Sequence, residues 1–235
     1  MFKNPVAINS EQHSRLRFTP ADNFSYARGL NHTPVMAFEL EKIAEYYPVV
    51  FETSTGLPMA VLGLLKGSNA FLDNDDKWCA PAIPALFSCY PFGLYHGKND
   101  QYVMIMDQSA DTLGNKKGKL LYNKQGDGFR MSPLLKDIKA RLQAIEKQRL
   151  VTNRAFATVA EKGVLAKHQA DFTLGDTEHK LRGFSIVDWD KVKQLDSVTL
   201  EQWKQNGILA LLEAQTASLK NFKVVQKLQQ LHLPA

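Results

Sequence analysis

The chain has 235 residues, of which 44% are hydrophobic and 23% are charged. These proportions are typical of a folded globular protein and exclude a disordered, collagen-like or fibrous chain. The formal net charge is +5, and the two cysteines, Cys79 and Cys89, are too few for a disulfide framework and lack the spacing of a structural zinc site, which favours a reducing compartment.

The first twelve residues mix charge, proline and asparagine and contain no apolar run of signal-peptide length. The longest uncharged stretch, residues 78–97, contains Pro81, Pro84 and Pro91, which a membrane-spanning helix would not accommodate. We therefore expect irregular chain here and a cytoplasmic protein without a transmembrane segment. Export by a route that needs no N-terminal signal is the alternative.

Apolar residues at loosely helical intervals predict a helix over residues 38–47, which ends before Pro48 because proline disfavours helical geometry in the residue before it. Residues 49–53 and 57–66 predict two strands of a β-hairpin. Gly56 in the short connection suits a turn that needs a positive φ.

Residues 69–73 predict a third short strand, so the first strands would form an antiparallel meander. The apolar run 102–107 predicts a central strand that is buried on both faces. Residues 108–131 are rich in Gly, Asn and Lys and predict a loop. Ser132 before Pro133 predicts the start of a long helix, because serine caps helix N-termini and proline suits the first turn.

The long helix after Pro133 carries an apolar stripe that includes Ile138, Leu142 and Phe156. Arg149 and Thr152 interrupt this stripe. We therefore expect the helix to bend or to leave the core in mid-course.

Residues 170–187 predict a second hairpin with its turn at Gly175 and Asp176. The last fifty residues predict helices throughout, broken at Gly207. Suitable N-terminal caps for these helices are Asp188, Ser197 and Asn221.

Together these elements predict the α+β fold class: a mostly antiparallel sheet with packed helices and a helical C-terminal region. We expect a single domain over residues 1–235, with a strand-rich part over about 1–130 and a helix-rich part over about 131–235.

The positive charge is concentrated between Lys116 and Arg154. This stretch contains eleven Lys or Arg residues and only three Asp or Glu residues. Such a stretch can attract nucleic acid, an anionic membrane or an acidic partner. No aromatic residues are interleaved as a stacking platform for single-stranded nucleic acid, so we favour the solvated face of a helix and expect no nucleic-acid partner.

Sequence signatures of catalysis and of nucleotide binding are missing. Residues 93–98 and 114–119 resemble a phosphate loop, but each has one residue too few between its glycines and no Ser or Thr after the lysine. No dinucleotide fingerprint, nucleophile elbow, zinc-protease motif or C-x-x-C pair is present. We therefore name no catalytic residue and expect no cofactor.

The remaining residues that could act as metal ligands or nucleophiles are better explained by structural roles. Asp73, Asp75 and Asp76 lack calcium-loop spacing and predict a turn. His13 and His32 have no nearby histidine or aspartate in a ligand pattern, which favours structural or surface roles and no metal site. Both cysteines lie in apolar surroundings that predict inert burial.

The densest group of aromatic residues lies on the proline-interrupted stretch. Trp78, Tyr90 and Phe92 offer apolar area and polar handles with few rotatable bonds, so they are candidates for a ligand or partner surface, with His32 as a fourth member. Simple core packing of the same rings is the alternative.

Five blocks of the sequence resemble the bacterial SapC family in order and spacing. They are HTPVMAFELEKIAEYYPVVF (32–51), VLGLL (61–65), NAFLDNDDKW (69–78), AIPALFSCYPF (82–92) and the tail from 187 to 219. The resemblance implies a protein of the surface-layer-associated type, without settled catalytic residues and distinct from the peptide-transport permease of the same name. Where the family often has a basic pair before its Y-P-F motif, this chain has Ser88 and Cys89.

These observations support three hypotheses of function. The first is a soluble SapC-like accessory or binding protein with a protein or small-molecule partner, associated with a surface layer or with a peptide or small-molecule modification or uptake pathway. The second is an enzyme or enzyme subunit in a modification pathway, because the resemblance implies genes for halogenase-like and cupin-like proteins nearby. The third is a basic DNA-binding regulator, which ranks last because the basic stretch and the closing helices do not coincide.

Overall fold

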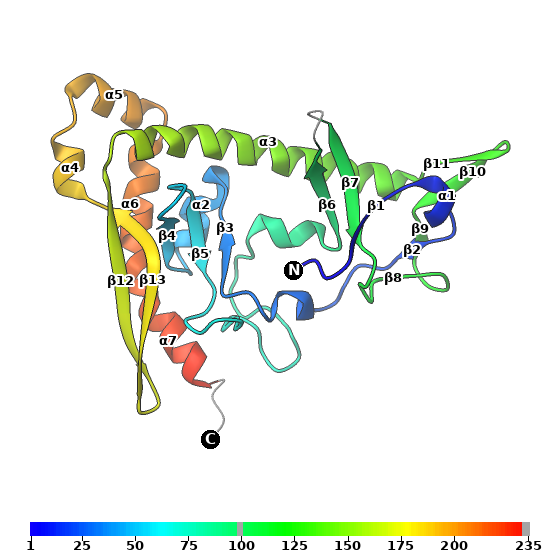
Figure 1. Cartoon of the computed structure of the whole chain (residues 1–235), viewed down its shortest axis with the longest axis horizontal. Coiled ribbons are helices and arrows are strands. Elements are labelled where there is room, and N and C mark those ends of the chain that lie inside the picture. Colours follow the sequence, from blue (N-terminus) through cyan, green and yellow to red (C-terminus); the bar gives the residue numbers. More distant parts are fainter. Residues whose placement is uncertain (98–100, 232–235) are drawn as a thin grey trace. The chain divides into compact units, whose positions relative to one another are not determined.

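The computed structural model describes residues 1–97 and 101–231. The chain divides into two compact units, and each unit is built from two separate segments (Figure 1). Unit 1 comprises Met1–Tyr26 and Leu86–Lys147, and unit 2 comprises Ala27–Ala85 and Gln148–Ala235. Helices accompany sheets whose described strand pairs are all antiparallel, which confirms the α+β fold class.

Unit 1 contains two small sheets, a hairpin and short helices. One sheet has the order β1-β7-β6 and the other has the order β8-β2-β9, while β10 and β11 form the hairpin. The strands are β1 (Pro5–Ala7), β2 (Arg17–Phe18), β6 (Phe92–His96), β7 (Tyr102–Asp107), β8 (Leu113–Gly114), β9 (Lys119–Leu120), β10 (Tyr122–Gln125) and β11 (Gly128–Met131). The short helices are α1 (Ser10–His13), η1 (Ser25–Ala27) and η2 (Ala85–Cys89), the last two lying where the chain passes between the units.

Strand β7 is central in its sheet, as predicted, but the prediction that it is buried on both faces was wrong. Only Met106 and Asp107 are buried, and Tyr102 and Val103 are exposed. The reason is that β1 pairs with β7 only from Ile105 to Asp107, so the first half of β7 extends beyond the core.

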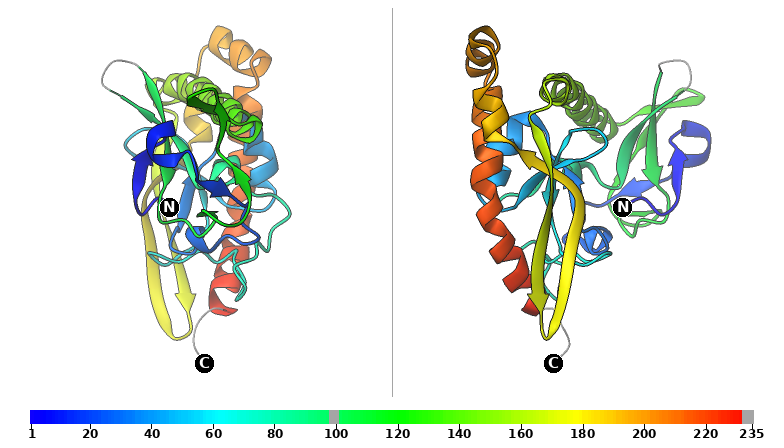
Figure 2. Two further views of the ribbon diagram at one scale, coloured as in Figure 1. Left: turned by 90° about the vertical axis from the view of Figure 1, so that its right-hand side faces the viewer. Right: turned by 60° about the vertical axis from the view of Figure 1, so that its left-hand side comes forward.

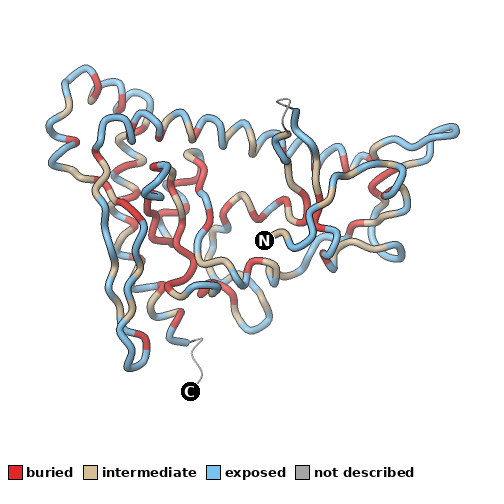
Figure 3. Tube along the Cα trace, in the orientation of Figure 1, coloured by how far each residue is buried: buried red, intermediate tan, exposed pale blue. Residues whose placement is uncertain are grey.

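The prediction of a loop over 108–131 was also wrong, because four short strands lie there. In the β10–β11 hairpin, Lys124 pairs with Phe129, and Gly126 takes a φ of 56° in the turn. The glycines and polar residues that suggested a loop therefore belong to tight turns between strands. The hairpin is largely exposed (Figure 3).

The helix α3 (Pro133–Glu161) begins as predicted, with the hydroxyl of Ser132 accepting a hydrogen bond from the backbone N–H of Leu135 at 3.2 Å. Its first half packs Leu142 into the core of unit 1. Its second half belongs to unit 2, where Phe156 contacts Phe51 with 5.5 Å between ring centroids. The helix thus leaves one core in mid-course, which confirms the expectation from its interrupted stripe.

Unit 2 is built on a five-stranded sheet of order β12-β13-β4-β5-β3. Both predicted hairpins are confirmed, with positive φ at Gly56 and Gly175 in their turns. The long β12–β13 hairpin runs beside α6 and α7 (Figure 2). The elements are β3 (His32–Pro34), α2 (Ala37–Ala44), β4 (Val49–Glu52), β5 (Pro58–Val61), β12 (Leu165–Leu174), β13 (Thr177–Val187), α4 (Trp189–Lys193), α5 (Ser197–Gln205), α6 (Ile208–Ser218), η3 (Leu219–Asn221) and α7 (Phe222–Leu231).

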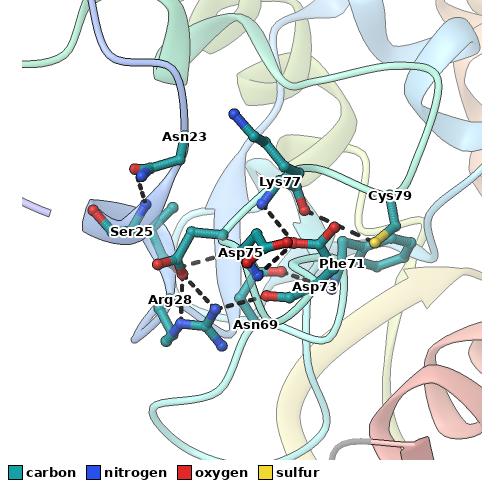
Figure 4. A network of polar contacts seen from close by, with 11 residues as sticks. Asn23, Ser25, Arg28, Asn69, Phe71, Asp73, Asp75, Lys77 and Cys79 are labelled. Carbon is teal, nitrogen blue, oxygen red and sulfur yellow. Dashed lines mark hydrogen bonds and ion pairs between the residues drawn. The ribbon is translucent and has the colours of Figure 1, made fainter.

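The strand predicted over 69–73 is absent, apart from one bridge between Leu72 and Trp78. Polar side chains hold the backbone in turns instead: Asn69 accepts from the N–H of Phe71 at 3.0 Å, and Asp73 accepts from the N–H groups of Asp75 and Lys77 (Figure 4). Such side-chain bonds compete with strand pairing. The predicted turn at the aspartates is thereby confirmed.

The stretch 78–97 is more regular than predicted, because it includes η2 and β6. Pro84 immediately precedes η2, and Pro91 immediately precedes β6. Each proline removes a donor only at its own position, so prolines at element boundaries do not prevent regular structure between them.

Two helix caps of the tail differ from the predictions. Asp188 caps α4 as expected, but Asp196, one residue before Ser197, caps α5 by accepting from the N–H of Thr199 at 2.8 Å. Asn221 instead donates to the carbonyl oxygen of Ala44 at 2.9 Å, so it closes the C-terminus of α2. Gly207 separates α5 from α6 with a φ of 80°, as predicted.

Candidate functional site

The four residues predicted for a binding surface fall into both units. Trp78 and His32 belong to unit 2, and Tyr90 and Phe92 belong to unit 1. No single unit therefore contains all four residues.

Trp78 is half-buried and tied into the core of unit 2. Its indole Nε1 donates to the hydroxyl of Tyr47, which in turn donates to the carbonyl oxygen of Ala82. The side chain of Tyr47 is buried, and burial raises the pKa of its hydroxyl. This chain of bonds gives Trp78 a clear structural role.

His32 is exposed at the start of β3, with its Nδ1 at 2.9 Å from the side-chain oxygen of Asn31. It lies at the rim of a pocket of about 260 Å³ in unit 2, together with Glu52 and Arg182. Trp78 does not line this pocket, so the structure does not bring the two predicted residues together there.

Tyr90 and Phe92 do meet, at a pocket of about 290 Å³ within unit 1 that we call the aromatic pocket. Phe92 is buried, and Tyr90 is half-buried. The walls come from the segment before η1, from η2 and the start of β6, and from α3. The residues that define it here are Phe24, Tyr26, Phe87, Cys89, Tyr90 and Arg141.

A stacked pair of tyrosines forms one wall of the aromatic pocket. The ring centroids of Tyr26 and Tyr90 lie 3.9 Å apart, with an angle of 13° between the ring planes. The hydroxyl of Tyr26 donates to the carbonyl oxygen of Phe87 at 3.0 Å. Burial raises the pKa of Tyr26, so this hydroxyl is neutral and remains a donor at physiological pH.

The hydroxyl of Tyr90 is fixed by Asp107, at 3.1 Å from its Oδ2. Burial alone would raise the pKa of Asp107, but hydrogen bonds from the backbone of Lys3 and Asn4 and from Ser109 lower it to about 2. Asp107 is therefore a buried carboxylate. Burial and this negative charge raise the pKa of Tyr90 to about 12.

Cys89 and Arg141 add a thiol and a guanidinium to the aromatic lining of the pocket. Burial raises the pKa of the Cys89 thiol, and the hydrogen bond with Ser88 and the nearby guanidinium of Arg141 oppose that shift only in part. The thiol is therefore protonated at neutral pH, as expected for an unreactive cysteine. Cys79, which we predicted to be buried, is exposed because it follows the exposed turn at residues 73–77.

Sequence reasoning missed Tyr26, Asp107 and Arg141 as parts of this site. Arg141 was counted only as one cation of the basic stretch, and Asp107 only as the end of a strand. The one signal in the sequence was the position of Asp107 at the end of the apolar run 102–107. A carboxylate at such a position is expected to be buried and to need hydrogen-bond partners. Tyr26 gave no signal, because its stacking partner is far away in the sequence.

Within residues 1–97 and 101–231, no three or more His, Cys, Asp or Glu side chains are grouped so that they could hold a metal ion. Buried His13 is engaged locally, with its Nδ1 at 3.1 Å from the carbonyl oxygen of Asn9. Over the same described residues, no helix is both long and apolar enough to cross a membrane.

Comparison with known proteins identifies the family. The model of the SapC family matches residues 8–225, which is most of the chain. The chain belongs to the SapC family. Searches of curated proteins and of solved structures found no match.

The first block of SapC resemblance, residues 32–51, has a structural explanation. Buried Glu39 accepts from the N–H of Met36 at 3.1 Å and from the N–H of Ala85 at 2.8 Å. Burial raises the pKa of Glu39 more than these bonds lower it. Phe51 is a core residue packed on Phe156.

The block AIPALFSCYPF contributes Ser88 and Cys89 to the lining of the aromatic pocket, and neither side chain is basic. The fold nevertheless places a cation at this wall of the pocket, because Arg141 of α3 lines it beside Cys89. The positive charge is supplied from another segment of the chain.

Proposed function

We propose that this SapC protein is a binding protein that holds a small organic molecule in the aromatic pocket of unit 1. The observation that carries the proposal is the Tyr26–Tyr90 stack, whose two hydroxyls are both hydrogen-bonded and whose rings line the pocket. Rings that are fixed before binding lose little conformational entropy when a ligand arrives.

The pocket volume restricts the ligand. Ligand pockets commonly measure ~300–1,000 Å³, so a pocket of about 290 Å³ suits a compact molecule with one ring. Aromatic rings favour a planar ligand, because offset and edge-to-face ring contacts add to the burial of apolar surface.

Such a binding protein would serve a pathway that modifies or takes up small molecules. As an accessory protein it would deliver one compound to that pathway or remove it from the pathway. A cytoplasmic location and a surface-layer association remain predictions.

Filling the pocket from an exposed position tests the proposal. Ala21 lines the pocket and is exposed, so Ala21→Phe adds a ring there with little effect on folding. Ala144→Phe is the control, because Ala144 is an exposed alanine that does not line the pocket. Saturation-transfer NMR with phenol, benzamide and benzoate measures binding.

We expect at least one of these compounds to bind the wild type and Ala144→Phe and to lose most of its signal with Ala21→Phe. Undiminished signals with Ala21→Phe would place binding elsewhere and contradict the proposal. Absence of signal for all three compounds would also contradict it.

A further inference from the structure

Arg141 is the one residue with a charged side chain among the described residues that line the aromatic pocket. It makes no hydrogen bond or ion pair with any other residue that the structure describes, and its side chain is exposed. A guanidinium that has no protein partner beside aromatic rings is available to a ligand.

The other ionisable groups at the pocket do not compete for this cation. Tyr26, Tyr90 and Cys89 all have raised pKa values and are neutral at physiological pH. The carboxylate of Asp107 does not line the pocket, and it is occupied by donors from Lys3, Asn4, Tyr90 and Ser109.

The charge of unit 1 favours an anionic ligand as well. Unit 1 contains 13 Lys or Arg residues against 8 Asp or Glu residues, whereas unit 2 contains 16 of each. The whole net charge of +5 therefore belongs to the unit that holds the pocket. An excess of one sign of charge raises the local concentration of ligands of the opposite sign.

We infer that the ligand of the aromatic pocket is a single-ring aromatic carboxylate, with its ring against the aromatic wall and its carboxylate on the guanidinium of Arg141. This inference rests on the proposed function and narrows it to one class of ligand. A guanidinium and a carboxylate form two parallel hydrogen bonds, which fix both position and orientation. A phosphate ester fits less well, because the single arginine of the pocket lining balances only part of its double charge.

The test compares two molecules of the same shape that differ in charge. Isothermal titration of the full chain with sodium benzoate and with benzamide gives a ratio of dissociation constants, and phenyl phosphate is a third ligand. The variants are Arg141→Gln, Arg141→Lys and the control Arg130→Gln, which removes the same charge from an exposed arginine that does not line the pocket.

We expect benzoate to bind the wild type and Arg130→Gln about tenfold more tightly than benzamide, as the loss of a charge-assisted hydrogen-bond pair predicts. In Arg141→Gln the two constants should become similar, while benzamide binding is unchanged. Arg141→Lys should recover only part of the preference, because lysine keeps the charge but cannot form the paired hydrogen bonds.

Three results would overturn the inference, and they differ in what else they imply. Equal binding of benzoate and benzamide to the wild type would reject the carboxylate and leave the proposed pocket in place. Tighter binding of phenyl phosphate that depends on Arg141 would replace carboxylate by phosphate. Failure of benzoate, benzamide and phenol to bind would count against the proposed function itself.

Discussion

The buried side chain of Gln215 donates through Nε2 to the carbonyl oxygen of Val49 at 2.9 Å, although 166 positions separate the two residues. The same side chain accepts from the N–H of Val187 at 3.3 Å. The direct pairing of β13 with β4 ends at Ser185 and Phe51, so the glutamine amide bridges the two strands where their own ladder stops.

Gln215→Leu should lower the free energy of unfolding by about 2 kcal/mol, because it leaves buried backbone groups with weakened or missing partners at nearly constant volume. Urea unfolding with the slope held constant measures the change. Gln202→Leu, at an exposed position of α5, serves as the control and should shift the midpoint little. Equal midpoints for wild type and Gln215→Leu would show that the bridge is not needed.

Ending the chain at Val187 should prevent unit 2 from folding. The removed helices supply Gln215 to β4 and β13, Asn221 to the end of α2, and Gln229 to the backbone N–H of Leu64 at 3.3 Å. Their loss also exposes core residues such as Leu212, at about 1.5–3 kcal/mol for each large side chain. A soluble shortened chain with a cooperative melt at the wild-type midpoint would refute this and favour an independent tail.

Asp107 should make unit 1 sensitive to acid. Its pKa is about 2 in the folded protein, against an ordinary value of 3.8, so the folded state binds fewer protons and gains stability from this group above about pH 4. That contribution should disappear as the pH falls from about 4 to about 2. Asp107→Asn should cost about 1.5–3 kcal/mol at neutral pH and should flatten the decline in acid.

Urea unfolding at several acidic pH values tests the Asp107 prediction. Asp127→Asn is the matched control, since Asp127 is exposed in the turn of the β10–β11 hairpin. Parallel acid profiles for the wild type and Asp107→Asn would contradict the assigned role of the carboxylate.

Trp78 and Tyr90 should respond differently to truncation. Trp78→Ala should cost about 2–3 kcal/mol of stability, somewhat less than truncation of a fully buried aromatic residue, and should leave binding at the aromatic pocket unchanged. Tyr90→Ala should weaken ligand binding, because it removes one ring of the stack. Thermal melts and NMR titrations of both variants measure stability and binding. Loss of binding in Trp78→Ala but not in Tyr90→Ala would show that Trp78, and not Tyr90, contributes to ligand binding.

The local elements of the fold were predictable where one residue type determines the backbone. Gly56 and Gly175 marked their hairpin turns, and Ser132 with Pro133 marked the start of α3. The prediction failed at residues 69–73, where apolar residues suggested a strand but Asn69 and Asp73 bind the backbone N–H groups themselves. Propensity alone does not show which of these two partners the backbone takes.

The site was predictable only in part, for a different reason. Tyr90 and Phe92 were predicted because large rings in a proline-rich stretch indicate a preorganised surface, and both line the aromatic pocket. Tyr26 and Arg141 reach the same pocket from distant segments, and no pattern along one sequence shows such long-range contacts. The assignment of Trp78 and His32 to a binding surface remains a prediction.

Backbone amide shifts of the full chain during titration with benzoate locate the binding site residue by residue. We expect the largest changes in the ¹H–¹⁵N spectrum at Tyr26, Cys89, Tyr90 and Arg141, with little change at His32 or Trp78. Changes confined to the surface around His32 and Arg182, or no change at saturating benzoate, would contradict the aromatic pocket as the binding site.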